Sequence, residues 1–345
     1  MKNKWSACIQ LAAVYVGTVV GAGFATGREI VVFFSQFGFF GLLGIFISGI
    51  IFAYFGAKLM RISVRIKATS YQEFTVFLFG KYIGNIINLF LLLMLIGVCA
   101  VMFSGAGAVF EEQLGLSKVF GVIFTIILSL IVMMVGTKGL FAVNTFVVPI
   151  MICFSFILFF LSISLPGFIN EIFTFQTLNL KTVTSPFSYS ALNLALAIAV
   201  LVPAASEIGD EEVVKWGGII GGVALMLILI SSHFSLIMLS DVEQFSIPMA
   251  TIMSTLAPQL SWVYILVIYG EIFTSVIGNI YGLERQLRNI LPLPSMVIIG
   301  GIILVSYLIS YVQYGTLLSW LYPVFGYISL VFLLFLWLKP LPRNK

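Results

Sequence analysis

The stretch VGTVVGAGFATGREI, residues 16–30, combines features that rarely share one helix. Its first part is apolar enough for lipid, yet Gly21, Ala22 and Gly23 interrupt it, and Arg28 and Glu29 follow. Glycine weakens a helix by about 1 kcal/mol relative to alanine, so the triplet predicts an unwound segment. Lipid cannot satisfy the backbone groups that such a segment frees, and therefore other parts of the chain must supply their partners.

Composition places the whole chain in a membrane. Hydrophobic residues make up 61% and charged residues 9%, and the mean hydropathy is +1.16, whereas soluble proteins carry about 25% charged residues. We expect α-helical spans, because barrel strands would show short alternating segments instead of long apolar runs. The chain is predicted to be an all-α integral membrane protein, residues 1–345 forming one transmembrane domain. The ten apolar runs lie at 6–36, 39–60, 83–110, 119–135, 140–165, 187–209, 216–240, 260–283, 295–312 and 315–338.

The basic residues predict the orientation. With a cytoplasmic N-terminus, 14 of the 17 fall in cytoplasmic segments, while Lys118 and Lys181 lie outside and Arg28 lies in the first span. The positive-inside rule therefore places both termini in the cytoplasm. We expect the chain in the cell membrane. Because these basic residues occupy short loops beside the lipid bilayer, we expect no nucleic-acid partner; protein partners are left open.

Two inverted halves are expected, residues 1–170 and 171–345. Five spans fall in each half, and an odd number forces the second half into the opposite orientation. The second half opens with SYSALNLALAIAVLVPAASEIGDEE, residues 188–212, where Pro203 precedes small residues. Breaks at matching places in the first and sixth spans point to a binding site near the midplane. The alternative is ordinary packing glycine and a simple proline kink.

The ten spans and two breaks resemble the LeuT-type fold of the amino acid, polyamine and organocation (APC) superfamily. The motif GAGFATGREI, followed by FF at 33–34, resembles sequences of the bacterial family called YkvI-like membrane proteins. The match is concentrated in residues 17–34. The resemblance implies a secondary transporter for amino-acid-like solutes. It also implies alternating access around a site between the first, third, sixth and eighth spans.

The two breaks indicate where a solute would bind. Amides freed at the start of the second half of the first span carry the positive end of a helix dipole, which suits a carboxylate. Carbonyls freed in the sixth span suit an ammonium group. We therefore expect a small zwitterionic or cationic solute. The expected solute-binding residues are Gly21, Ala22, Gly23, Phe24, Ala25, Phe103, Leu201, Val202, Ala204, Ser206 and Glu207.

The eighth span holds a polar cluster, YGEIFTSVIGNIYG at residues 269–282, in which Glu271, Thr274 and Ser275 lie within about one turn. The resemblance implies that Thr274 and Ser275 hold a sodium ion together with the carbonyls of Gly17 and Val20. Glu271 departs from the pattern of the related family. A carboxylate there strengthens cation binding or accepts a proton itself, so Na⁺ and H⁺ both stay open as the coupling ion. No other cofactor or metal is expected.

Arg28 and Glu29 lie about one turn beyond the first break. Adjacent residues of a helix do not face each other, so we expect them to find separate partners, in the cavity or as a gate. The related family has an outer-gate arginine near this place. Here the arginine is displaced by one position, and the tenth span carries no acid to pair with it.

An enzyme is not expected. The stretch GAGFATG lacks the glycine spacing of a dinucleotide-binding loop and has no strand before it. HExxH, GxSxG and Walker A motifs do not occur. A channel or a ligand-sensing membrane receptor on the same fold is the alternative function: a channel conducts without saturation, and a receptor binds without flux.

Overall fold

The computed structural model describes residues 2–68, 70–135, 137–288 and 291–342. Within these ranges no β-strand occurs, and one isolated bridge joins Gly38 to Phe175. The α-helices are α1 Lys2–Val19, α2 Ala22–Ala25, α3 Arg28–Phe33, α4 Phe39–Ile66, α5 Tyr71–Phe79, α6 Lys81–Ala108, α7 Lys118–Val135, α8 Thr137–Ile163, α9 Phe168–Ile172, α10 Leu180–Ile208, α11 Glu211–Leu236, α12 Pro248–Leu256, α13 Ser261–Arg288, α14 Ser295–Ile309 and α15 Tyr314–Leu338.

Each expected apolar run falls mainly on helical structure, which confirms the all-α membrane class. Among the described residues, six helices are long and apolar enough to cross a membrane: α4, α10, α11, α15, α6 with the π-turn that follows it, and α13 with the 3₁₀ turn that precedes it. Shorter apolar helices cover 118–134, 149–163 and 295–309. The count of ten spans in two inverted halves stays a prediction.

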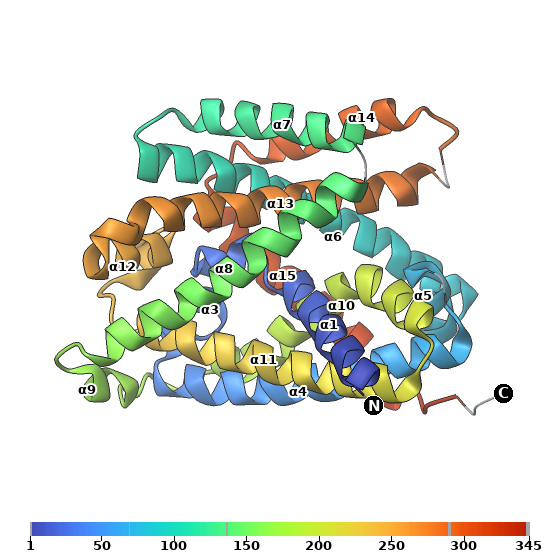
Figure 1. Ribbon diagram of the computed structural model, residues 1–345, viewed down its shortest axis with the longest axis horizontal. Coiled ribbons are helices and arrows are strands. Elements are labelled where there is room, and N and C mark those ends of the chain that lie inside the picture. Colours follow the sequence, from blue (N-terminus) through green and yellow to red (C-terminus); the bar gives the residue numbers. More distant parts are fainter. Residues whose placement is uncertain (1, 69, 136, 289–290, 343–345) are drawn as a thin grey trace.

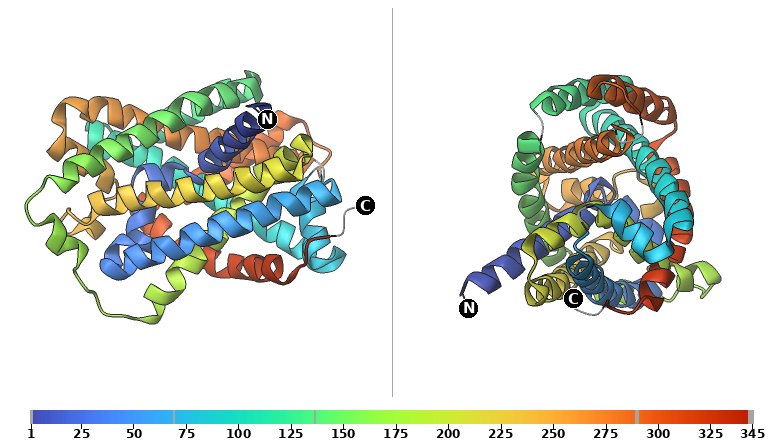
Figure 2. Two further views of the ribbon diagram at one scale, coloured as in Figure 1. Left: turned by 60° about the horizontal axis from the view of Figure 1, so that its bottom comes forward. Right: turned by 90° about the vertical axis from the view of Figure 1, so that its right-hand side faces the viewer.

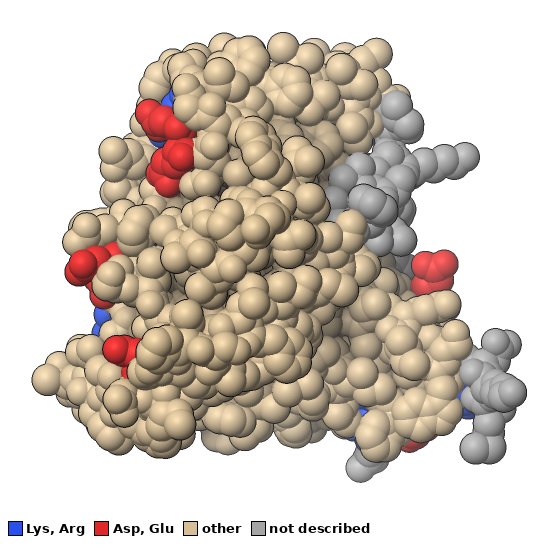
Figure 3. All heavy atoms as spheres, turned by 60° about the vertical axis from the view of Figure 1, so that its left-hand side comes forward, with Lys and Arg blue, Asp and Glu red and all other residues tan. Residues whose placement is uncertain are grey.

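The long helices run roughly side by side along the longest axis of the molecule (Figure 1). Helices α9 and α12 lie at one end of this axis, and α5 and the C-terminus lie at the other (Figure 1). Seen nearly end-on, the long helices enclose the short segments α2 and α3 (Figure 2). Charged atoms are sparse on the face in Figure 3, where a broad uncharged surface separates them, as a lipid-facing surface requires.

Small residues bring α4 and α11 into close contact. A Cβ added at Gly218 would lie 2.6 Å from the Cα of Ala57, and one added at Gly222 would lie 2.3 Å from the backbone nitrogen of Ala53. Real side chains do not approach so closely, so both positions require glycine. Close backbone approach through small residues is a common way for membrane helices to associate.

Charged side chains join the two ends of the chain at one end of the bundle, which we call the basic end. Lys4 forms an ion pair with Asp210 (N···O 2.7 Å), at the junction of α10 and α11. Arg61 and Arg65 of α4 both bind Glu211 at the start of α11, and Arg65 also donates to the carbonyl of Pro342. The N-terminal helix and the C-terminal segment therefore meet the same junction.

The predicted break in the sixth span is wrong. Helix α10 continues from Leu180 to Ile208 with Pro186 and Pro203 inside it. Proline at 203 removes a single amide donor, and neighbouring helices of a membrane bundle can absorb the resulting kink. One missing donor is therefore not enough to open the helix here.

Candidate functional site

The first span does break, as predicted. Helix α1 ends at Val19 and α2 begins at Ala22, while Gly21 is extended at φ −123° and ψ −168°. The amide of Val20 still donates to the carbonyl of Val16 (2.7 Å). Among the described residues, no backbone amide donates to the carbonyls of Gly17 and Val20, and the Gly21 amide donates to no backbone carbonyl. The two carbonyls expected to face an ion are thus free of the backbone ladder.

Helix α13 faces one side of this break. A Cβ added at Gly21 would lie 3.3 Å from Oγ of Ser275, so the gap and the expected ion-site serine are in direct contact. Tyr264, on the same helix, donates its hydroxyl to the carbonyl of Ala25 (3.1 Å). Thr274 donates Oγ1 to the carbonyl of Glu271 (3.0 Å) and so keeps an oxygen that can still accept or coordinate.

Glu271 is the buried acid of α13. It is 1% exposed, and its Oε1 is buried without a hydrogen-bond partner. A buried carboxylate oxygen with no partner is costly, so native proteins keep one mainly where an ion, a proton or a ligand completes it. The position next to the Thr274 and Ser275 pair makes this atom the strongest chemical signal near the break.

A second acid, Glu29 of α3, closes the other side of the break. It is 4% exposed, and its Oε1 accepts a hydrogen bond from Nδ2 of Asn193 in α10 (3.2 Å). Its other oxygen lies against the backbone of Gly23, where an added Cβ would be only 2.5 Å away. Glu29 is therefore inside the bundle beside the break. Asn193 was not among the residues expected from the sequence, although an amide side chain in an apolar helix is itself a signal.

Arg28 points the opposite way, toward the end of the bundle that holds α12. Its guanidinium donates to the carbonyls of Glu243 and Phe245 (3.1 Å for the latter) and to Oγ of Ser319 in α15 (3.2 Å). These partners are uncharged, in agreement with the lack of an acid in the last span. Arg28 and Glu29 thus separate as expected, and Arg28 ties the 3₁₀ turn Val242–Gln244 to α3 and α15.

Two further bonds hold this end of the break. The hydroxyl of Thr26 lies 2.9 Å from that of Tyr314 in α15, and the carbonyl of Thr26 accepts from the amide of Met249 in α12 (3.0 Å). Both partners are buried. In this structure the side of the break facing α12 is therefore closed by hydrogen bonds from α12, α15 and the turn between α11 and α12.

The residues expected from the sixth span lie elsewhere. The hydrogen bond from Asn193 to Glu29 shows that Asn193 is the part of α10 beside the break. Pro203 is ten residues, or about 15 Å of helix, further along α10. We expected carbonyls freed by a break in this segment to bind the solute. Because α10 does not break, that expectation no longer holds. Leu201 and Val202 are fully buried, Ala204 is half-buried, Ser206 donates to the carbonyl of Ser63 (3.0 Å), and Glu207 is exposed.

The remaining expected residues are packed into the core. Ala22, Phe24 and Ala25 of the broken segment are at most 1% exposed, and Phe103 of α6 is fully buried. The aromatic rings Phe24 and Phe103 therefore have surroundings that fit either packing or a solute wall. In the described part of the chain, no three His, Cys, Asp or Glu side chains are grouped to hold a metal ion.

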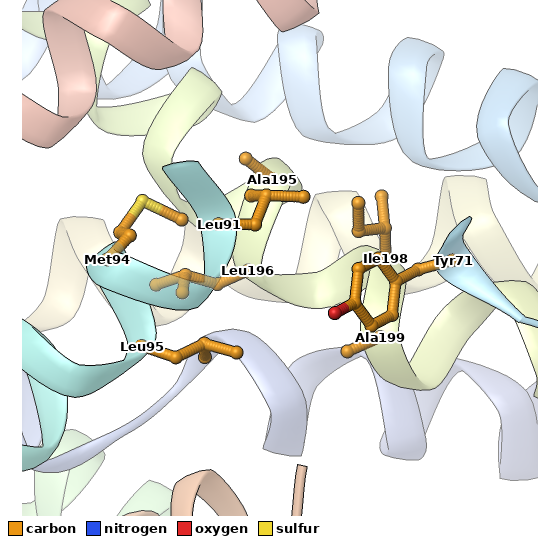
Figure 4. A pocket seen from close by; sticks show the side chains of 8 residues that line it. All are labelled: Tyr71, Leu91, Met94, Leu95, Ala195, Leu196, Ile198 and Ala199. Carbon is orange, nitrogen blue, oxygen red and sulfur yellow. The ribbon is translucent and has the colours of Figure 1, made fainter. Parts of the chain in front are cut away.

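An apolar hollow between α5, α6 and α10 is too small for a solute. Its volume is about 10 Å³, and Figure 4 shows that the hydroxyl of Tyr71 is the single polar group among its eight lining side chains. A cavity of this size holds at most one water, which would need two or more polar partners. We therefore assign it to packing.

Comparison with known proteins places the chain. No family model matches it. The chain is 51% identical over 345 residues to the "Uncharacterized membrane protein YkvI" of Bacillus subtilis (strain 168), covering 100% of the chain and 99% of that protein. It is 22% identical over 351 residues to the "Uncharacterized protein YyaD" of the same organism, covering 98% of each.

Solved structures share the fold. The structure of Mhp1, a nucleobase-cation-symport-1 family transporter in a closed conformation with bromovinylhydantoin bound, aligns with a TM-score of 0.63 and 11% identity over 91% of this chain and 74% of that one. The manganese transporter of Eremococcus coleocola in complex with an aromatic bis-isothiourea compound aligns with a TM-score of 0.58 and 15% identity over 96% and 78%. Such low identities show the fold alone. The identity to YkvI over the full length shows more: the chain belongs to the YkvI family of membrane proteins.

Proposed function

We propose that this protein is a secondary active transporter, not an enzyme, that moves a small zwitterionic or cationic solute by alternating access. The observation that carries the proposal is the break between α1 and α2 with a buried acid on each side, Glu271 and Glu29. The fold shared with two transporters supports a transport function. Membership of the APC superfamily and a place in the cell membrane, with both termini in the cytoplasm, belong to the same proposal.

The solute class follows from the groups around the break. The free Gly21 amide suits a carboxylate, and Glu29, beside Gly23, suits an ammonium group. An amino-acid-like solute presents both groups. A nucleobase-cation-symport-1 family transporter and a manganese transporter share this fold, so the choice of solute rests on these residues and not on the fold.

The coupling ion is proposed to bind at Gly17, Val20, Glu271, Thr274 and Ser275. Two free carbonyls, two hydroxyls and a carboxylate are hard oxygen ligands, which suit an alkali cation. Glu271 alone could instead carry a proton between the two sides of the membrane. These two possibilities predict different responses to one substitution.

The test uses purified protein in proteoliposomes, with amino-acid and amine uptake measured under sodium and proton gradients. Saturable, gradient-dependent flux supports the proposal; binding without flux would indicate a receptor, and unsaturable conductance would indicate a channel. With proton coupling, Glu271→Gln removes the pH dependence of flux. With sodium coupling, it weakens apparent sodium affinity by about tenfold, the value of one lost charge contact of roughly 1.4 kcal/mol.

A matched control is available on the same helix. Glu284 is also buried in α13 but pairs with Arg288 (3.8 Å), about two and a half turns beyond Ser275. Glu284→Gln should leave the ion and pH dependence of flux unchanged. If both substitutions changed the ion and pH dependence of flux equally, the effect would come from loss of a buried acid anywhere in α13 and not from the Glu271 carboxylate in particular.

A further inference from the structure

A groove of about 610 Å³ lies between α4 and α11, away from the helix break. None of the residues that line it belongs to the proposed transport site. Its walls change character along their length, from apolar residues to basic ones. The lining residues are Ile50, Ala53, Tyr54, Ala57, Lys58, Arg61, Lys215, Ile219 and Leu341.

The groove follows the seam where α4 and α11 approach most closely. Gly218 and Gly222 lie against Ala57 and Ala53, and none of these four residues has a side chain long enough to fill the surface of the seam. Larger residues on either side, such as Tyr54, form the walls. The result is a narrow apolar channel open to the outside of the bundle, where an acyl chain can lie.

The basic end of the groove carries unneutralised positive charge. Arg61 and Arg65 share the single carboxylate of Glu211, with N···O distances of 2.7 and 2.6 Å. Lys58 donates to an uncharged partner, the carbonyl of Trp337 (2.8 Å). Lys215 lies 5.4 Å from the centre of the Trp216 ring, and no ion pair joins it to a described acid.

Neighbouring acids do not remove the excess. Asp210 pairs with Lys4, and Glu212 is exposed to solvent. The residues that line the groove include three basic side chains, Lys58, Arg61 and Lys215, and no acidic one; Glu211 neutralises Arg61 from the junction. This excess of positive charge suits an anion.

Tryptophans mark the depth of the basic residues in the membrane. Trp5 and Trp216 are about half-exposed and lie with ring centres 6.3 Å apart, close to Lys215. Exposed tryptophan concentrates at the level of lipid headgroups. From Arg61 to Ile50 the α4 helix rises about 16 Å into the apolar region. The basic side chains thus lie at headgroup level and the apolar walls at acyl-chain level.

We propose that this groove binds one anionic phospholipid. Lys58, Arg61 and Lys215 hold its phosphate, and an acyl chain follows the seam beside Ala53, Ala57 and Ile219. Basic pockets between membrane helices on the cytoplasmic side are suited to anionic headgroups. The bound lipid would hold α4 against α11 and, through Arg61 and Glu211, against the junction with α10.

The test compares lipids of equal chain length on the purified, detergent-solubilised protein. Phosphatidylglycerol should be retained in native mass spectra and raise the unfolding temperature; phosphatidylcholine, with no net charge, should do neither at the same concentration. Glycerol phosphate tests the headgroup alone and should have no effect, because it cannot use the apolar walls. Equal stabilisation by phosphatidylcholine, or full stabilisation by glycerol phosphate, would overturn the proposal.

Substitutions test the residues. The double variant Lys58→Gln and Lys215→Gln keeps the length of both side chains and should bind phosphatidylglycerol about 30-fold more weakly. The control, Lys81→Gln with Lys181→Gln, removes the same charge elsewhere and should bind as the unmodified protein does. Equal weakening in both doubles, or none in the first, would reject the site. Unfolding temperatures without lipid show that each variant is folded.

Discussion

Residues 21–23 and residues 203–206 are the two places where the sequence predicts a break, and they behave differently. The first opens into α1 and α2, whereas the second stays within one continuous helix, α10. Polar side chains lie beside the first segment: Ser275 lies against Gly21, and Glu29 lies against Gly23. The second has lost one amide at Pro203, and its exposed end reaches solvent at Glu207. Weak helix formers alone therefore do not open a helix: the segment that opens has polar side chains of α13 and α3 beside it, whereas the Pro203 segment stays helical.

The strongest test of this difference is Gly23→Ala. The new Cβ would lie 2.5 Å from a carboxylate oxygen of Glu29 and 3.3 Å from a methyl of Leu318, so the Glu29 carboxylate must shift, and we expect this shift to disturb its hydrogen bond from Asn193. Losing a buried hydrogen bond to a charged group costs about 2 kcal/mol, and we expect both stability and solute flux to fall. Thermal unfolding and proteoliposome uptake measure the two effects.

The control for Gly23→Ala is Gly300→Ala in α14. No heavy atom lies within 4 Å of a Cβ added there, so unchanged or slightly raised stability is expected. If Gly23→Ala behaved like this control, the contact between Glu29 and the break would have no functional weight.

Gly21→Ala should have a smaller effect, confined to the ion. Its Cβ would meet Oγ of Ser275 at 3.3 Å, a contact that a shift of a few tenths of an ångström relieves. Because φ at Gly21 is −123°, alanine fits the backbone, and we expect a stability change below about 1 kcal/mol. The apparent affinity for the coupling ion should fall while that for the solute is kept. Because alanine keeps the amide proposed to bind the solute carboxylate, a loss of solute affinity alone would show that the contact between Gly21 and Ser275 does not serve the ion.

Pro203→Ala examines the unbroken side and should change transport least. Alanine restores an amide donor inside a helix that is already continuous, so stability should be equal to or above that of the unmodified protein. Flux should stay within about twofold, or 0.4 kcal/mol. Should flux disappear while the protein remains folded, α10 would have to bend at Pro203 during the transport cycle.

The smallest expected effect concerns the ion pair that links α1 to the end of α10. The hydrogen bond from Lys4 lowers the pKa of Asp210. A depressed carboxyl pKa stabilises the fold above the unfolded value of about 4 and ceases to do so as pH falls through the lower folded value. Asp210→Asn keeps the helix cap but removes the charge, so the unfolding temperature should lose part of its decline below pH 4.

Asp241→Asn serves as the control for this pH profile. Asp241 lies in the turn at the opposite end of the bundle with φ +52°, a conformation that asparagine also tolerates. Its profile should match that of the unmodified protein. An identical change in both variants would show a general effect of net charge.

Sequence patterns predicted part of the site and missed part, for identifiable reasons. The weak helix at Gly21 to Gly23 and the cluster at Glu271 are local features, and the structure brings the break and Ser275 together. Asn193 could not be predicted because its role depends on a hydrogen bond to Glu29, which lies 164 residues away in the chain. The break predicted at Pro203 is wrong because the helix propensity of a residue says nothing about which neighbouring side chains lie beside it.

Hydropathy, charge and glycine placement were sufficient for the membrane class, the helical fold and the break in the first span, because each depends on the chain's own residues and on the properties of lipid. Packing decided the rest. It kept α10 whole, turned Glu29 inward to Asn193 and Arg28 outward to the turn at Val242–Gln244, and left one oxygen of Glu271 without a partner. These outcomes depend on which side chains meet across helices, and contacts between distant segments are not encoded in any local pattern.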